Sequence, residues 1–434
     1  MHAPDVATRE HLTAEMTSPT STTDPDAPTF TGENERSAWH RVLRKAGLVY
    51  LFSRLCVATG AALVAAELRA DANLVKDNFP NSPWADPHYA GKPIPKSALK
   101  PMLDVLTSWD GIWYLRIVRS GYPRNVQPNV TYDVSDARAA FFPAYPNLVR
   151  AVDWVLPGGD TVAALITNLL LGAVAVFLVG LLARELFDIK VSERAMILMS
   201  LFPGSFVLSF AYTEALLLVL AGGTLWFLLK RQWLLAGLLA AIGTATRPNG
   251  IALIAACAIA AFFAIRERHE WKALIAPALA PIGFIGFQLW LGAHTGENGV
   301  WFRVQTEAWG EGTSFGLTAV RRTAKAFIHP LTSPTNTITA VSVLTMILLL
   351  WFLKKHRLPA AFNAYIGVVL LLMLLPSTVT ARPRFLYTAF PLLIAAAVWF
   401  ERDRRRDWWP YVVGACSAGL VALTALYGVL GAIP

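Results

Sequence analysis

The stretch TVAALITNLLLGAVAVFLVGLLA, Thr161–Ala183, carries no charged side chain. As a helix it is long enough to cross the ~30 Å hydrocarbon layer of a bilayer. Similar apolar runs recur along the 434-residue chain, which is 55% hydrophobic and 15% charged. A soluble domain averages roughly 25% charged residues, so a large soluble core is excluded. The pattern predicts an all-α polytopic membrane protein with about eleven transmembrane helices. The expected spans are 46–66, 161–183, 195–211, 214–229, 233–246, 250–265, 273–292, 338–353, 361–376, 384–400 and 410–432.

Basic residues gather in short clusters between these runs. The clusters are Arg41, Arg44 and Lys45; Arg184, Lys190 and Arg194; Lys230 and Arg231; Arg266, Arg268 and Lys272; Lys354, Lys355 and Arg357; and Arg402, Arg404, Arg405 and Arg406. Counted along the expected spans, all six fall on one side of the membrane. The positive-inside rule assigns that side, and the N-terminus with it, to the cytoplasm. Orientation and anionic headgroups therefore account for the formal net charge of +9, and no nucleic-acid partner is expected.

The remaining polar sequence divides into a tail and two long segments. Residues 1–37 are rich in Thr, Ser, Pro, Asp and Glu without a signal-peptide pattern, so we expect a disordered tail. Residues 38–434 are expected to form the membrane domain, with the segments 67–160 and 293–337 on the extracytoplasmic side. Loops of this length are usually functional. The sequence contains no metal-binding constellation, Walker loop or dinucleotide motif, and we expect neither a metal nor a cofactor.

The first long segment contains the stretch TSWDGIWYLRIVRSGYP, Thr107–Pro123. Its apolar spacing predicts a short amphipathic helix lying on the outer leaflet. Trp109, Tyr114 and Tyr122 are of the aromatic type that settles at a membrane–water interface, and they are candidate substrate contacts.

Asp110, expected near the start of this helix, has two interpretations. It can be a helix cap or an ion-pair partner of Arg116 or Arg119, as most interfacial aspartates are. Alternatively, it is a general base that takes a proton from an attacking hydroxyl group. The residues alone leave both interpretations open.

Two Arg-Pro turns are expected on the extracytoplasmic face. One holds Arg382 and Arg384 on either side of Pro383, and the other places Arg247 just before Asn249. Arginines at a helix mouth either snorkel outward or meet an anion. Orientation rules do not call for arginine on this face. The turns therefore suggest a phosphate group held at the outer membrane surface, in one pocket with Asp110.

Glu214 follows Tyr212 in the turn AYTE and also has several interpretations. It can stabilise a helix N-terminus, orient a sugar hydroxyl group or pair with Arg247. His329 is a lone histidine before a proline, a position that is usually structural, with a smaller chance of lining the site.

The second long segment alternates aromatic and polar residues in VWFRVQTEAWGEGTSFG, Val300–Gly316. Trp301 and Trp309 offer ring faces, and Gln305 and Glu311 offer hydrogen-bonding groups. This combination is typical of a sugar-binding site, and it is equally typical of an interfacial aromatic belt.

Several motifs together resemble a known family. They are SWDGIWYLRIVRSGY, AFFPAYPNLVR, FPGSFVLSFAYTEALL, TRPNGI and RPRFLYTAFP. The resemblance runs from about residue 46 to about residue 400. This combination resembles the glycosylphosphatidylinositol mannosyltransferase II family, in a prokaryotic, PIG-V-like form.

The resemblance implies a GT-C-type membrane glycosyltransferase that uses a polyprenyl-phosphate sugar donor and inverts the anomeric centre. It makes Asp110 the candidate base and the arginines of RPRF the candidate phosphate ligands, with YTE and TRPNG lining the cavity. It does not carry over the acceptor, which is a glycolipid, a glycan or a protein.

Two other functions remain possible at this stage. One is a GT-C enzyme that uses another polyprenyl-phosphate sugar. The other is a transporter or flippase that moves a polyprenyl-linked lipid without chemistry, and it would need polar groups across the membrane. The expected spans hold few charges, with Arg54 the main exception, and the polar motifs crowd one face. This favours an enzyme acting on membrane lipids.

Overall fold

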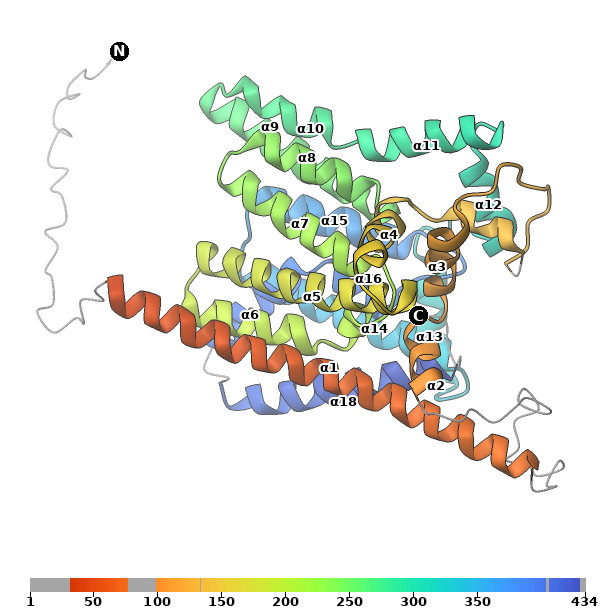
Figure 1. The fold of residues 1–434 in the computed structure, drawn as a ribbon. Helices are drawn as coiled ribbons and strands as arrows, with labels where there is room; N and C mark the ends of the chain where they lie inside the picture. The colour runs from red at the N-terminus through yellow and green to blue at the C-terminus, as the bar shows by residue number, and fades with distance from the viewer. Residues whose placement is uncertain (1–31, 77–98, 133, 403–405, 430–434) are drawn as a thin grey trace, which may run out of the picture. The chain divides into compact units, whose positions relative to one another are not determined.

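The computed structural model describes residues 32–76, 99–132, 134–402 and 406–429, and those residues form helices joined by turns (Figure 1). Of residues 1–41, which form a unit of their own, the described ones are the first turns of helix α1 (Gly32–Lys76). Residues 32–37 are helical, and the rest of the predicted disordered tail, residues 1–31, lies outside the described residues. The second unit is residues 42–434, and apart from the first turns of α1 all that follows concerns it.

The α-helices after α1 are α2 (Leu99–Leu106), α3 (Asp110–Ser120), α4 (Ala144–Val155), α5 (Gly159–Leu186), α6 (Ile189–Leu201), α7 (Glu214–Leu229), α8 (Trp233–Thr244), α9 (Ala252–Arg268), α10 (Ile275–Leu279), α11 (Ile282–Thr295), α12 (Val300–Trp309), α13 (Leu317–Ile328), α14 (Pro334–Lys355), α15 (Ala360–Leu374), α16 (Pro383–Thr388), α17 (Pro391–Arg402) and α18 (Trp409–Gly428). The 3₁₀ helices are η2 (Ser135–Ala140), η3 (Pro203–Leu208), η4 (Pro248–Ile251), η5 (Trp271–Leu274) and η6 (Arg406–Trp408). No strand occurs in the described ranges, so the all-α prediction is confirmed for them.

Among the described residues, six helical segments are long and apolar enough to cross a membrane. They are Glu35–Glu67, Gly159–Leu186, Pro248–Arg268, Trp271–Thr295, Pro334–Lys355 and Trp409–Gly428. The predicted spans 214–229, 233–246 and 361–376 correspond to shorter apolar helices, α7, α8 and α15.

Three predicted spans are broken: span 273–292 divides between η5, α10 and α11, and two others are each broken in two. Span 195–211 divides between α6 and η3, and span 384–400 divides between α16 and α17. Pro203 and Pro391 stand where the second piece begins, and proline removes a helical hydrogen bond and clashes with the preceding turn.

The breaks let distant backbone segments approach each other beside the site. A Cβ atom added at Gly204 would lie 2.5 Å from the Pro383 carbonyl oxygen, so only glycine fits between η3 and α16. The Tyr387 hydroxyl group on α16 donates to the Met199 carbonyl oxygen on α6 at 2.6 Å. The Arg54 guanidinium group of α1 donates to the Ser205 carbonyl oxygen of η3 at 2.9 Å. These contacts fix α16 against the core.

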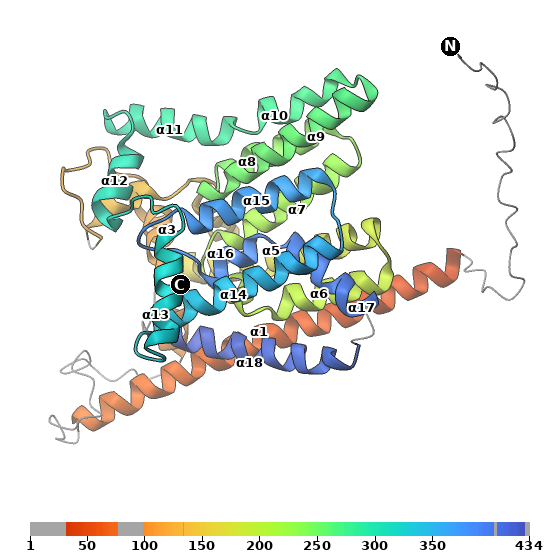
Figure 2. The same ribbon diagram turned by 180° about the vertical axis from the view of Figure 1, so that it is seen from behind.

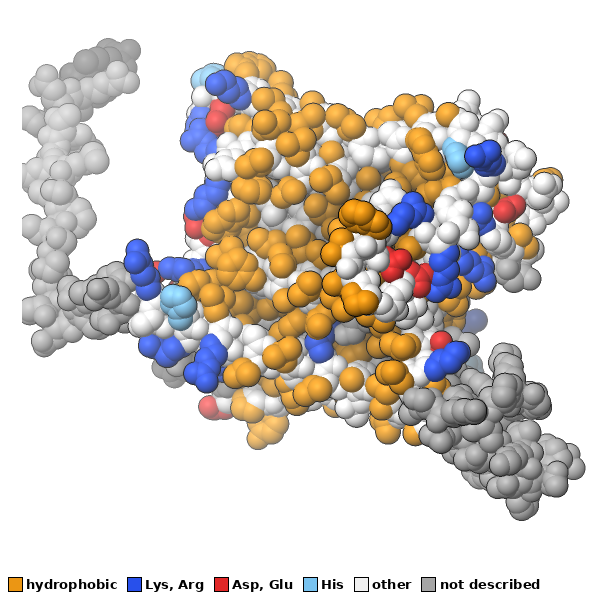
Figure 3. All heavy atoms as spheres, viewed as in Figure 1, with side chains coloured by type: hydrophobic (Ala, Val, Ile, Leu, Met, Phe, Trp, Pro, Cys, Tyr) orange, Lys and Arg blue, Asp and Glu red, His pale blue; other side chains and the backbone are white. Residues whose placement is uncertain are grey.

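The described basic residues from Lys45 to Arg402 that belong to these clusters lie at one end of the helices. Ion pairs there join Lys45 to Glu193, Lys230 to Glu185, Arg231 to Glu270, Arg194 to Glu401 and Arg402 to Asp188. Lys and Arg side chains line that edge in Figure 3, and a broad hydrophobic surface separates them from the opposite end. Helices α3, α12 and α13 lie at the opposite end in both ribbon views (Figures 1 and 2). The assignment of the basic end to the cytoplasm stays a prediction.

The predicted short helix of the first long segment is α3, but it does not lie on a surface. Trp113 and Tyr114 are 2% and 5% exposed, and Leu115, Ile117 and Val118 are buried as well. The helix packs against α4, α5 and η2. The Arg150 side chain of α4 donates to the Ile117 carbonyl oxygen at the end of α3 at 2.7 Å. The sequence predicts the aromatic residues of this helix at the membrane–water interface, but in the structure Trp113 and Tyr114 belong to the buried core beneath the site.

Candidate active site

The backbone at the start of α3 holds Asp110 in a constrained position. Trp109 adopts φ 56° and ψ −121°, a left-handed conformation that is uncommon for a non-glycine residue. Its indole Nε1 donates to the Tyr427 carbonyl oxygen at 3.0 Å, and Gly111 stands against the Cβ atom of Ala211. Asp110 is thereby placed at the first helical position, next to the turn that leads into α7.

Asp110 begins a chain of alternating charges. Its Oδ2 lies 2.6 Å from Nη1 of Arg384, and the same Nη1 lies 3.7 Å from Oε1 of Glu214. Glu214 in turn forms an ion pair with Arg247. The side chain of Glu214 is 1% exposed and that of Asp110 is 25% exposed. We conclude that Glu214 is an internal counter-ion for both arginines, whereas Asp110 is accessible.

The arginines that are close to Asp110 in the sequence are not its partners. Arg119 pairs with Asp160, with Nη2 donating to Oδ1 at 3.0 Å. Arg116 lies over the Trp113 ring, 4.5 Å from its centroid. The Asp110 side chain instead meets an arginine 274 residues further along the chain. Asp110 is thus ion-paired, but not with either predicted partner.

Three hydrogen-bond donors beside this network have no acceptor among the described residues. They are Nε of Arg247, Nε of Arg384 and Nδ2 of Asn249, and all three atoms are buried. A buried donor without an acceptor costs about 1–3 kcal/mol, and native proteins rarely leave one unsatisfied. Two guanidinium groups and an amide with free donors form a site suited to an oxyanion such as phosphate.

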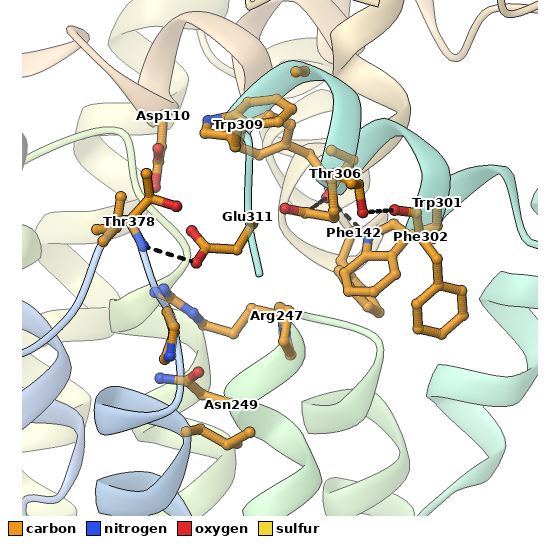
Figure 4. A pocket seen from close by; sticks show the side chains of 18 of the residues that line it. Asp110, Phe142, Arg247, Asn249, Trp301, Phe302, Thr306, Trp309, Glu311 and Thr378 are labelled. Atoms are coloured by element: carbon orange, nitrogen blue, oxygen red, sulfur yellow. Dashed lines mark hydrogen bonds between the residues drawn. The ribbon is translucent and has the colours of Figure 1, made fainter. Parts of the chain in front are cut away.

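These groups line one cavity of about 850 Å³. Figure 4 shows Asp110, Glu311 and Arg247 around its interior, with Trp309 beside Asp110. The predicted site residues that line the cavity are Trp109, Asp110, Tyr114, Arg247, Asn249, Trp301, Gln305, Trp309 and Arg384. The structure therefore brings the candidate base, two of the candidate phosphate ligands and most of the candidate aromatic contacts together.

Five predicted site residues do not line the cavity: Arg382, Tyr122, Tyr212, Glu214 and His329. Arg382 is 1% exposed and donates to the Thr339 hydroxyl group of α14 at 2.9 Å. The Tyr122 hydroxyl group donates to the Phe141 carbonyl oxygen at 2.7 Å.

Of the other three residues, Tyr212 and Glu214 contact the site arginines from behind the cavity wall, and His329 lies away from the site. Tyr212 is fully buried, and its ring lies 5.4 Å from the Arg384 guanidinium carbon. Glu214 forms an ion pair with Arg247, which is one of the three interpretations that its sequence position allowed. His329 is exposed just beyond the end of α13.

The cavity also contains residues that the sequence did not single out, Tyr132 and Thr378 among them. The Tyr132 ring packs edge-on against the rings of Trp113 and Trp309, with 5.5 Å between ring centroids in both pairs. Thr378 lies four residues before Arg382, where the turn around Pro383 begins. Neither residue belongs to a pattern that sequence alone could have marked.

A partly exposed charge cluster joins the second long segment to the first. Arg303 of α12 pairs with Glu297 at 2.6 Å and with Glu307 at 2.8 Å. The Arg303 guanidinium group lowers the pKa of the Glu297 carboxyl group. Glu307 also accepts a hydrogen bond from the Val130 backbone N–H at 2.9 Å. Helix α12 is thereby placed as one wall of the cavity.

Tyr114 supplies the cavity with a hydroxyl group that stays protonated. Burial raises its pKa, and the nearby Asp110 carboxylate raises it further. The hydroxyl group lies 3.4 Å from the Thr213 hydroxyl oxygen. Tyr114 is therefore suited to hydrogen bonding and not to proton abstraction.

Comparison with known proteins gives one family match. Residues 145–291 match the family described as dolichyl-phosphate-mannose-protein mannosyltransferase. This region contains Glu214, Arg247 and Asn249 of the site. No curated protein matches the chain.

Solved structures with similar helical arrangements are longer and distant in sequence. ArnT from Cupriavidus metallidurans, bound to undecaprenyl phosphate, is 14% identical with a TM-score of 0.48, over 70% of this chain and 56% of that one. The oligosaccharyltransferase AglB from Archaeoglobus fulgidus, in complex with an inhibitory peptide and a dolichol-phosphate, is 14% identical with a TM-score of 0.37, over 86% of this chain and 54% of that one. The chain thus spans about half the length of the solved structures it matches.

Proposed function

We propose that this protein is a membrane glycosyltransferase of the GT-C type. It transfers a mannosyl residue from polyprenyl-phosphate-mannose to a hydroxyl group of a glycolipid, glycan or protein, with inversion at the anomeric carbon. The observation that carries the proposal is the meeting of three buried, unsatisfied donors and one accessible carboxylate in a single cavity. The match of residues 145–291 to a mannosyltransferase family adds support for the sugar.

The arginines act on the leaving group. As the bond from the anomeric carbon to the phosphate oxygen breaks, the phosphate takes both electrons and its negative charge grows. Arg247, Arg384 and Asn249 donate to its oxygens, and these interactions are stronger in the transition state than in the ground state. A phosphate leaving group needs no protonation. One carboxylate is therefore sufficient, in contrast to the two that hydrolases use.

Asp110 takes the proton of the acceptor hydroxyl group as that oxygen attacks the anomeric carbon. In the free protein its carboxylate accepts a hydrogen bond from Arg384 at 2.6 Å, so that oxygen is occupied. A donor phosphate competes with Asp110 for this guanidinium group and leaves the carboxylate free. The donor should therefore bind before the acceptor.

The proposal places the reaction at the extracytoplasmic membrane face. The cavity lies at the end of the helices opposite the basic clusters, and the positive-inside rule assigns those clusters to the cytoplasm. A donor with a long lipid can then reach the cavity from the outer leaflet.

The test is to incubate the purified protein with radiolabelled polyprenyl-phosphate-mannose and a membrane lipid extract, and to separate the products. We expect label to move from the donor to a lipid or glycan product, which also identifies the acceptor. A protein that moves labelled donor between the leaflets of vesicles but transfers no sugar is a transporter, and that result would contradict the proposal.

A further inference from the structure

The cavity contains a second carboxylate that the reaction described above does not use. Glu311 lies in the turn between α12 and α13 and lines the cavity. Figure 4 places it between Asp110 and Arg247 and beside Thr378. It therefore reaches the space that a bound sugar would occupy.

The backbone of the loop after α15 holds this carboxylate in one orientation. Oε1 of Glu311 accepts the N–H of Ser377 at 3.0 Å and the N–H of Thr378 at 3.2 Å. The same loop is held against residues 312–314, with the Ser314 N–H donating to the Leu375 carbonyl oxygen at 2.7 Å. Oε1 of Glu311 thus already accepts two hydrogen bonds, whereas Oε2 accepts none from the described residues.

Glu311 differs from the other acids of the site in its charge partners. Asp110 pairs with Arg384 and Glu214 pairs with Arg247, whereas no Lys, Arg or His within the described ranges forms an ion pair with Glu311. An oriented carboxylate with a free oxygen accepts hydrogen bonds from hydroxyl groups, and it repels a phosphate group. The cavity consequently offers cationic donors on one side and a hydroxyl acceptor on another, as a glycosyl phosphate requires.

We propose that Glu311 is a specificity-determining residue that accepts a hydrogen bond from one hydroxyl group of the transferred sugar. This inference rests on the proposed function. It adds that the enzyme distinguishes sugars by the presence and position of that hydroxyl group.

The test measures kcat/KM for polyprenyl-phosphate-mannose and for its 2-, 3-, 4- and 6-deoxy analogues, with the wild-type protein and the Glu311→Gln variant. Glutamine keeps a carbonyl oxygen for the Ser377 and Thr378 N–H groups, so the loop is retained, but it loses the free acceptor. We expect the variant to lose between about 10- and 100-fold on the full sugar, because hydrogen bonds to charged groups are among the strong ones. We also expect one deoxy analogue to react with both proteins at similar rates.

The matched control is Asp160→Asn, which removes a carboxylate that pairs with Arg119 outside the cavity. This variant should rank the five donors as the wild type does. Equal losses by Glu311→Gln on all five donors, or no loss at all, would overturn the assignment of Glu311. A wild-type protein that transfers no sugar from any polyprenyl-phosphate donor would instead overturn the proposed function, and the assignment with it.

Discussion

At the residue scale, the ion pair between Asp110 and Arg384 governs the chemistry that the site can perform. The Asp110→Asn variant should transfer sugar about 10²–10⁴-fold more slowly, because the amide cannot accept the acceptor's proton. Folding should be retained, since Arg384 still has Glu214 at 3.7 Å as a counter-ion. Single-turnover transfer and the melting temperature of the same preparation measure the two effects separately.

The control is Asp160→Asn, which removes an aspartate paired with Arg119 outside the cavity. Its transfer rate should stay within a few-fold of the wild-type rate. If the Asp110→Asn variant is as active as this control, Asp110 is not the general base.

The unsatisfied donor of Arg247 gives a second prediction. The Arg247→Lys variant keeps the positive charge beside Glu214 but lacks the Nε–H group. We expect its affinity for polyprenyl phosphate to fall roughly 10-fold or more, which corresponds to about 1.4 kcal/mol or more. Titration calorimetry in detergent measures this loss. Unchanged affinity would show that the phosphate group binds elsewhere.

At the element scale, the contact between η3 and α16 positions Arg384. In the Gly204→Ala variant the new Cβ atom must displace the Pro383 backbone, from which it would lie 2.5 Å. Overpacking of this kind costs about 1–3 kcal/mol, and it should also slow transfer by moving Arg384.

The matched change is Gly367→Ala on α15, where nothing lies within 4 Å of the added Cβ atom. Alanine favours a helix over glycine by about 0.5–1 kcal/mol, so this variant should be as stable as the wild type or more stable. Thermal unfolding in detergent compares the two variants. A Gly204→Ala variant with wild-type stability and activity would show that η3 does not hold α16 in place.

Sequence patterns predicted the helices better than the packing around the site. Apolar runs mark α5, α9 and α14 because lipid-facing and buried faces are both hydrophobic. Asp110 and Arg384 could be chosen as candidate site residues because charged side chains at the end of a membrane helix are costly. Their contact could not be predicted, because it depends on how segments 274 residues apart fold together. Tyr122 and Tyr212 are of the same residue types as the site residues, and only the folded structure shows that they lie behind lining residues and do not line the cavity themselves.

At the scale of the whole molecule, the account requires the basic end and the cavity end to lie on opposite sides of the membrane. A cysteine at His329, exposed at the cavity end, should react with a membrane-impermeant maleimide in right-side-out vesicles. A cysteine at Glu267, exposed at the basic end, should react only after permeabilisation. Native Cys56, Cys257 and Cys416 are first replaced by serine or alanine to remove background labelling. The reverse labelling pattern would place the cavity in the cytoplasm and exclude an extracytoplasmic reaction.

The central claim is that the cavity binds the phosphate group of a polyprenyl lipid and thereby frees Asp110. A structure of the protein with bound polyprenyl phosphate tests this claim most directly. The account predicts phosphate oxygens within hydrogen-bonding distance of Nε of Arg247 and Nε of Arg384, with the guanidinium group of Arg384 withdrawn from Asp110. A phosphate group bound away from both arginines, with the Asp110–Arg384 pair intact, would contradict it.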